Sequence, residues 1–203
     1  MRPPCFGQPC FGISQSLRRV TRGGSLGFHV MVSGEVIFVL GGAASGKSAF
    51  AETLFSDAQT PVYIASAQAF DAEMRAKIDR HIARRGSKWR TVEAPLDAAG
   101  AIEALGSADV CLFDCATLWL SNHLLSETYL AAEQARLLAA IRSCPARLVV
   151  VSNEVGMGVV PDNALARRFR EAQGRLNIEL ATAADTVVHV VAGIPRVLKG
   201  ALA

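Results

Sequence analysis

The sequence has few cysteines, few aromatic residues and no long apolar run, and each shortage excludes a class of protein. Five scattered cysteines in 203 residues are too few for the disulfide framework of a small secreted domain. Cys111 and Cys115 have no second Cys/His pair nearby, so their spacing does not fit a zinc site. No apolar run reaches the roughly 18–20 residues that a membrane span requires. We therefore expect no membrane span and a cytoplasmic protein.

Acidic residues are missing from residues 1–34, which contain four arginines and no Asp or Glu. The rest of the chain carries 17 basic and 18 acidic residues, a balance that does not fit a general nucleic-acid binder. Residues 1–34 also lack the apolar centre of a secretory signal, although their composition fits a transit peptide. We expect a disordered extension, or an upstream start codon chosen in error, because Met31 stands just before the first expected strand. Residues 35–203 are then one catalytic domain.

Short apolar runs and amphipathic segments alternate through the rest of the chain. Strands are expected at 36–40, 61–65, 110–115, 147–152 and 186–192. Helices are expected at 47–55, 71–85, 96–105, 130–142 and 163–183, the last with an apolar face of Leu165, Phe169, Leu176 and Leu180. This alternation predicts an α/β fold with a mostly parallel sheet and helices on both faces. In such sheets ligands bind at the carboxyl ends of the strands.

A glycine-rich loop, GGAASGKS, follows the first expected strand and precedes a helix. It fits the pattern G-x-x-x-x-G-K-[ST], whose backbone N–H groups surround a phosphate. In this motif Lys47 would contact the β- and γ-phosphates and Ser48 would bind Mg²⁺. The alternative is a glycine-rich turn without a ligand. The loop residues are Gly41, Gly42, Ala43, Ala44, Ser45, Gly46, Lys47 and Ser48.

Asp114 ends the apolar run VCLFD, where folds with this loop carry the Walker B acid, a carboxylate that binds the metal ion. Together with Ser48 it would hold Mg²⁺ or the water shell of the ion. The alternative is a strand-end aspartate that caps the following turn.

His81 lies in the basic segment KIDRHIARRGSKWRTVEAP, residues 77–95. On a helical wheel it falls on the same side as Met74, Ile78 and Ile82, which indicates a half-buried histidine that packs with its helix. A nucleophilic histidine would instead need a phosphate target and cations that hold it. Cations are available in Arg80, Arg84, Arg85 and Lys88. The segment alone leaves both interpretations open.

Four segments together resemble the adenosylcobinamide kinase/adenosylcobinamide-phosphate guanylyltransferase family of cobalamin biosynthesis. They are GGAASGKS, YIASAQAFDAEMRAKIDRHIARRGSKWRTVEAP, LFDCATLWLSNHLL and the long segment from VSNEVGMG to RVLKG. They cover nearly all of residues 36–200, and the last segment is the most specific. The resemblance implies a P-loop NTPase fold with a RecA-like sheet, commonly assembled as a homotrimer.

The resemblance also implies two reactions. The enzyme would phosphorylate adenosylcobinamide with ATP or GTP. It would then transfer GMP from GTP to the new phosphate, through a GMP-histidine intermediate, giving adenosylcobinamide-GDP and pyrophosphate. The histidine that matches the family motif is His81, whereas His29, His123 and His189 do not match it.

Site residues follow from the same matching. The resemblance implies His81 and Lys47 as catalytic residues, and Ser48 and Asp114 as Mg²⁺ ligands. It implies nucleotide contacts from the whole loop 41–48 and from Ile64, Ala65, Ser66, Ile82, Ala83, Arg84, Arg85, Glu93 and Asp114. Glu93 would accept hydrogen bonds from the guanine N–H groups. The alternative is that Glu93 is an ordinary surface acid. Asn153 and Glu154 follow the fourth expected strand, and we hypothesise that they belong to a loop that contacts the substrate.

The sequence departs from the family pattern at two places in the site. Ala44 stands where the family loop often has arginine, and Gly86 follows Arg85 where proline is common. Two other functions remain open on the same motifs. One is a regulatory P-loop GTPase without a covalent intermediate, and the other is a kinase-only relative in which His81 serves packing.

Overall fold

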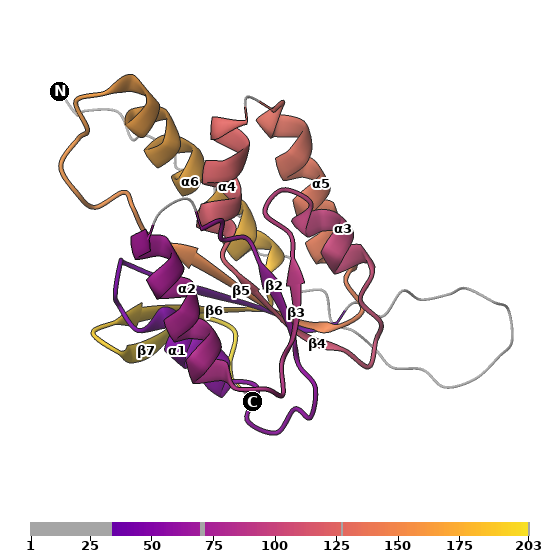
Figure 1. The fold of residues 1–203 in the computed structure, drawn as a ribbon. Coiled ribbons are helices and arrows are strands. Elements are labelled where there is room, and N and C mark those ends of the chain that lie inside the picture. Colours follow the sequence, from indigo (N-terminus) through magenta and orange to yellow (C-terminus); the bar gives the residue numbers. More distant parts are fainter. Residues whose placement is uncertain (1–33, 70–71, 127, 203) are drawn as a thin grey trace, which may run out of the picture. The chain divides into compact units, whose positions relative to one another are not determined.

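The computed structural model describes residues 34–69, 72–126 and 128–202, and these residues form one seven-stranded sheet with helices on both faces (Figure 1). The strands are β1 (Val36–Gly41), β2 (Val62–Ala65), β3 (Arg90–Glu93), β4 (Val110–Asp114), β5 (Arg147–Asn153), β6 (Thr186–Val191) and β7 (Ile194–Lys199). The helices are α1 (Lys47–Thr53), α2 (Ala72–Arg85), α3 (Ala98–Glu103), α4 (Ala116–Leu125), α5 (Leu130–Ser143) and α6 (Ala164–Ala183). The extension expected at the start of the chain lies outside the described residues, apart from Gly34.

The sheet has the strand order β3-β2-β4-β5-β1-β6-β7, and every neighbouring pair is parallel except β6 and β7. The strand β5 lies between β1, which leads into the glycine-rich loop, and β4, which ends at Asp114. The predicted α/β fold with a mostly parallel, RecA-like sheet is therefore confirmed.

Alternate residues of the central strands pack on opposite faces of the sheet, as strand geometry requires. Phe38 and residues of the neighbouring strands such as Phe113 and Val150 face a core closed by helices α3 to α6. Ile37 and Val39 face a second core, which contains Phe55, just beyond the end of α1. Figure 1 shows α1 and α2 on one side of the sheet and α3 to α6 on the other. Because both faces are covered, the central strands read as continuous apolar runs, which is why the sequence revealed them.

Three elements were not predicted, and each lacks a periodic signal. β3 (RTVE) is an edge strand with only Val92 partly buried, and all six residues of β7 are exposed. β7 follows a two-residue turn at Ala192 and Gly193, whose φ angles of 51° and 79° suit a tight hairpin. The helix α4 is buried on most sides and buries polar as well as apolar residues, so its sequence carries little amphipathic signal.

The predicted apolar face of α6 is correct in its second half and wrong at its start. Leu176 and Leu180 are 1% and 2% exposed, whereas Leu165 is 49% exposed. The helix is twenty residues long, so its first turns extend beyond the core that covers its later turns. Within the described part of the chain, no helix has both the length and the apolar character needed to cross a bilayer.

The carboxyl ends of the six parallel strands lie along the same side of the sheet. Gly41 of β1 pairs in register with Asn153 of β5, and Ala65 of β2 pairs with both Glu93 of β3 and Asp114 of β4. Polar side chains that are far apart in the sequence therefore gather along this edge, where ligands bind in sheets of this kind.

Candidate active site

The glycine-rich loop has the tight geometry of a phosphate cradle. Gly46 precedes α1 with φ of 91°, and a Cβ atom on Gly41 would lie 2.5 Å from Ser45 Oγ. Both positions therefore require glycine. The Lys47 ammonium donates to the Gly42 carbonyl oxygen at 3.1 Å, so the lysine folds back over the loop. The first turn of α1 directs its N–H groups toward the same space, which favours an anion there.

A cavity of about 780 Å³ opens beside this loop, between the carboxyl edge of the sheet and α2. The predicted apolar stripe of α2 lines the cavity, since Met74, Ile78, His81 and Ile82 all border it. Ile82 is 53% exposed, so this stripe does not close a core. The helix therefore presents His81 to a pocket, and the packing interpretation does not describe its surroundings.

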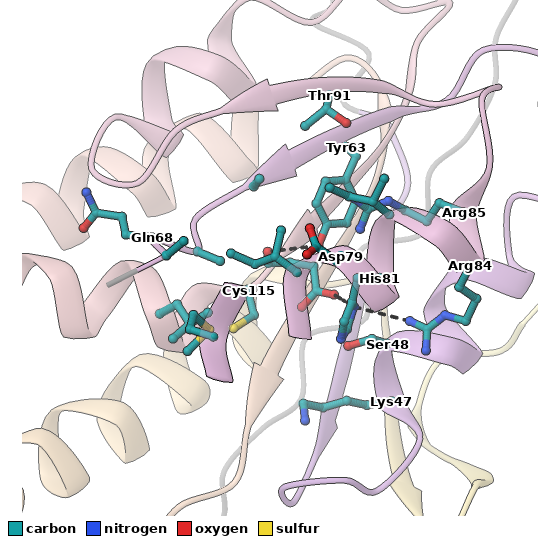
Figure 2. A pocket seen from close by; sticks show the side chains of 18 of the residues that line it. Lys47, Ser48, Tyr63, Gln68, Asp79, His81, Arg84, Arg85, Thr91 and Cys115 are labelled. Carbon is teal, nitrogen blue, oxygen red and sulfur yellow. Dashed lines mark hydrogen bonds and ion pairs between the residues drawn. The ribbon is translucent and has the colours of Figure 1, made fainter. Parts of the chain in front are cut away.

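His81 lies between a cation and a carboxylate. Its Nδ1 is 3.4 Å from Arg84 Nη2 (Figure 2). The same nitrogen is 4.0 Å from Asp114 Oδ2. Because a guanidinium can only donate, Nδ1 accepts in the contact with Arg84 and carries the lone pair of a neutral imidazole. Arg84 is itself held by Glu52 of α1 through two hydrogen bonds of 2.5 and 2.7 Å.

The surroundings of His81 favour its neutral form. Partial burial lowers the pKa of His81 below its ordinary value of 6.5, and the positive charge of Arg84 lowers it further, while Asp114 opposes both effects. A neutral imidazole is the form that can attack phosphorus, so the site favours the nucleophilic form of this residue.

Asp114 is 8% exposed and ends β4 next to the pocket. Its Oδ2 atom is buried and has no hydrogen-bond partner among the described residues. An aspartate that capped the next turn would use its oxygens on backbone N–H groups, so the capping interpretation does not explain Oδ2. A buried carboxylate oxygen with no partner fits a site for a cation.

The far wall of the pocket holds a second charged group. The Arg85 guanidinium lies 3.3 Å from the centre of the Tyr63 ring (Figure 2). The Tyr63 hydroxyl donates to the Asp114 carbonyl oxygen at 3.5 Å, and burial raises the pKa of Tyr63 above its usual range. Glu93 and Thr91 line the same wall. After Arg85, Gly86 ends α2 with φ of 70°, a conformation that suits glycine.

The structure brings most of the predicted site residues to this one pocket. Those that line it are Ala44, Ser45, Gly46, Lys47, Ser48, Ala65, His81, Ile82, Arg84, Arg85, Glu93 and Asp114. Gly41, Gly42 and Ala43 form the start of the loop but do not border the cavity, and Ala83 points to solvent. Ile64 and Ser66 are fully buried, and the Ser66 hydroxyl is bonded to the Cys115 backbone.

Several lining residues were not among the predicted contacts. They are Ala49, Tyr63, Ala67, Gln68, Ala69, Met74, Arg75, Ile78, Asp79, Thr91, Pro95, Cys115 and Leu118. Most of them sit on strand ends or on the pocket face of α2, so the rule that ligands gather at carboxyl strand ends could have indicated some of them. Of the two residues assigned to a substrate loop as a hypothesis, Asn153 lines the pocket and Glu154 does not.

Comparison with known proteins shows the family of the chain. The family model described as "Cobinamide kinase / cobinamide phosphate guanyltransferase" matches residues 37–198. The chain is 45% identical over 166 residues to the bifunctional adenosylcobalamin biosynthesis protein CobP of Pseudomonas aeruginosa, covering 80% of this chain and 96% of that protein. It is 43% and 44% identical over 175 residues to the bifunctional proteins named CobU of Escherichia coli and Salmonella typhimurium, covering 78% of this chain and 97% of each. The chain belongs to the cobinamide kinase / cobinamide phosphate guanyltransferase family.

Proposed function

We propose that both reactions of the family take place in this one pocket, with His81 as the nucleophile that carries GMP. The observation that supports the proposal is the position of His81. It borders the same cavity as Lys47 and Ser48 of the phosphate loop, and it lies between Arg84 and Asp114. A nucleotide whose phosphates bind the loop would bring phosphorus within reach of the imidazole.

In the kinase reaction the substrate is adenosylcobinamide and the donor is ATP or GTP. The hydroxyl oxygen of the aminopropanol arm forms a bond to the γ-phosphorus. The bond from that phosphorus to the bridging oxygen breaks, its electron pair leaves with the nucleoside diphosphate, and the hydroxyl proton passes to solvent. Lys47 and the loop N–H groups hold the phosphates and offset the charge on the transferring group.

In the guanylyltransferase reaction the unprotonated nitrogen of His81 attacks the α-phosphorus of GTP. A P–N bond forms, and the bond to pyrophosphate breaks. A phosphate oxygen of adenosylcobinamide phosphate then attacks the same phosphorus, and the P–N bond breaks as the imidazole regains its lone pair. The products are adenosylcobinamide-GDP and free His81. Splitting the transfer in this way replaces one difficult step with two easier ones.

Mg²⁺ would be held by Ser48 and Asp114 together with substrate phosphates. No group of three or more His, Cys, Asp or Glu side chains forms a metal cage in the described parts of the chain. Mg²⁺ in nucleotide sites is usually bound by one or two protein groups and by phosphate oxygens, so these two residues are sufficient. The unpartnered Oδ2 of Asp114 fits this role, and the ion would supply charge neutralisation to the phosphates.

Nucleotide contacts of the other predicted residues that line the pocket belong to the same proposal, with Glu93 accepting from the guanine edge. A homotrimer is also part of it. Met157, Val159 and Val160, in the loop between β5 and α6, are 85%, 94% and 68% exposed, and a subunit interface would cover such a group. Mass measurement of the purified protein in solution tests the trimer.

The decisive experiment incubates the protein with Mg²⁺ and GTP labelled at the α-phosphate, and measures label that is acid-labile and base-stable on the protein. We expect label on the wild type and none on His81→Ala. His189→Ala is the matched control and should be labelled like the wild type, since His189 lies on β6 and does not line the pocket. Label on His81→Ala would move the nucleophile elsewhere. No label on the wild type, with GTP bound, would favour a regulatory GTPase or a kinase-only enzyme.

A further inference from the structure

Unpartnered buried polar atoms concentrate at the pocket. Among the described residues, five buried side-chain atoms lack a hydrogen-bond partner, and four of them belong to residues that line the cavity: Ser45 Oγ, Arg85 Nη1, Asp114 Oδ2 and Asn153 Oδ1. An unmet buried polar atom costs on the order of 1–3 kcal/mol, so native proteins keep few of them. Their gathering here indicates that a polar ligand supplies the missing partners. Three of these residues already have a role in the proposed site, whereas Asn153 has only its hypothetical place in a substrate loop.

Asn153 lines the pocket at the end of the strand between the phosphate loop and Asp114. It ends β5, the strand between β1 and β4, and pairs in register with Gly41 at the start of the phosphate loop. Asp114 ends the strand on the other side of β5. A terminal phosphate that is held by the loop on one side, and bridged toward Asp114 on the other, would lie over the end of β5. The side chain of Asn153 would then lie next to the transferred phosphoryl group.

A buried polar network holds the backbone of Asn153 in place. Its N–H donates to Thr117 Oγ1 at 2.7 Å, and its carbonyl oxygen accepts from Asn177 Nδ2 at 3.1 Å. Ser152 and Gln173 complete the network, since the Ser152 hydroxyl donates to Asn177 Oδ1 at 2.8 Å and Gln173 Nε2 donates to Ser152 Oγ at 2.9 Å. These polar groups lie between the sheet, α4 and α6, and they fix one residue at the pocket wall. Such fixed positioning is what phosphoryl transfer requires of a protein.

We propose that Asn153 is a further catalytic residue of the kinase reaction, which contacts both reacting groups. Its Nδ2 donates to the γ-phosphate, and its Oδ1 accepts from the incoming hydroxyl, because an amide offers a donor and an acceptor side by side. The hydroxyl oxygen bonds to the γ-phosphorus, the bridging P–O bond breaks, and the proton passes to solvent. Asn153 aligns these groups and is chemically unchanged. This inference rests on the proposed placement of the nucleotide in the loop.

The test compares Asn153→Ala and Asn153→Asp with Asn163→Ala, the same chemical change at the exposed start of α6. One assay measures transfer of labelled γ-phosphate to adenosylcobinamide, and a second measures GMP-histidine from α-labelled GTP. For Asn153→Ala we expect kcat/KM of phosphoryl transfer to fall about 10- to 100-fold, the effect of one hydrogen bond to a charged group. At saturating GTP, which offsets a loss of affinity, the rate of GMP-histidine formation should fall much less than the rate of phosphoryl transfer, since the γ-phosphate does not react in that step.

The aspartate variant separates phosphate contact from packing. Asp has the shape of Asn but would repel the γ-phosphate, so contact predicts that Asn153→Asp is the worse kinase, whereas packing predicts that Asn153→Ala is worse. A kinase rate of Asn153→Ala equal to that of Asn163→Ala would overturn the proposal, as would an active Asn153→Asp. If Asn153→Ala fails to fold, the kinase activity of Asn153→Asp alone decides between phosphate contact and packing. A wild type that phosphorylates adenosylcobinamide without forming GMP-histidine would refute the role of His81 and leave the Asn153 comparison intact.

Discussion

The ion pair between Glu52 and Arg84 joins α2, the helix that carries His81, to α1, the helix that follows the phosphate loop. The Arg84 guanidinium makes two hydrogen bonds to the Glu52 carboxylate, and the two side chains are 42% and 11% exposed. The Nη2 atom of Arg84 also contacts His81. The change Glu52→Gln removes the charge and one acceptor oxygen with little change in shape. It should therefore loosen Arg84 and the position of His81 above the loop.

The size of the effect follows from the partial burial of the pair. Exposed ion pairs contribute about 0.2–1 kcal/mol, and breaking a buried pair costs about 3–5 kcal/mol. Arg84 is partly in water and can be resolvated, so we expect the free energy of unfolding to fall by about 1–2 kcal/mol. For a domain of this size the Tm would fall by about 3–6 °C. Because the geometry of His81 also loosens, the rate of GMP-histidine formation should fall about 10-fold.

The assays are thermal unfolding and the time course of labelling with α-labelled GTP. Glu171→Gln is the matched control, because Glu171 forms a pair with Arg175 at 3.3 Å in which the side chains are 70% and 78% exposed. That change should lower stability by less than about 0.5 kcal/mol and leave labelling unchanged. The reasoning fails if the two variants have the same Tm and the same labelling rate.

Two further predictions concern protonation and the loop. In the nucleotide-free protein, NMR titration should show a pKa of His81 below 6.5, raised in Arg84→Ala. Because folding favours the neutral form of His81, its contribution to stability is complete above the pKa of the unfolded state and is lost as pH falls through the pKa of the folded state. A measured His81 pKa above 6.5 would contradict the burial argument. Gly46→Ala places a side chain at φ of 91° and 3.0 Å from Gly193 Cα, so GTP affinity should fall at least about 10-fold. Gly174→Ala, in open space on α6, should stabilise by about 0.5–1 kcal/mol and bind GTP normally.

The fold was predictable to the extent that its elements carry local patterns. The five buried parallel strands appear as apolar runs, and the loop 41–48 appears as a motif, because both signals reside in consecutive residues. The edge strands β3 and β7 escaped prediction, since an exposed strand needs no apolar pattern and is defined by its neighbour. The stripe of Met74, Ile78 and Ile82 was periodic as predicted, but periodicity shows only that a helix has an apolar face. It does not show whether that face meets a core or a cavity.

The sequence by itself determined the phosphate loop, the family and the candidate histidine, because the motifs that carry them are runs of consecutive residues. Only the tertiary structure decided which distant side chains meet. Arg84 lies 32 residues from Glu52, and Asn153 reaches Gly41 only because β5 inserts beside β1. Strand order sets these contacts, and strand order depends on how helices pack over both faces of the sheet. Local propensity carries no information about that packing, so the surroundings of His81 and the position of Asn153 emerged only from the fold.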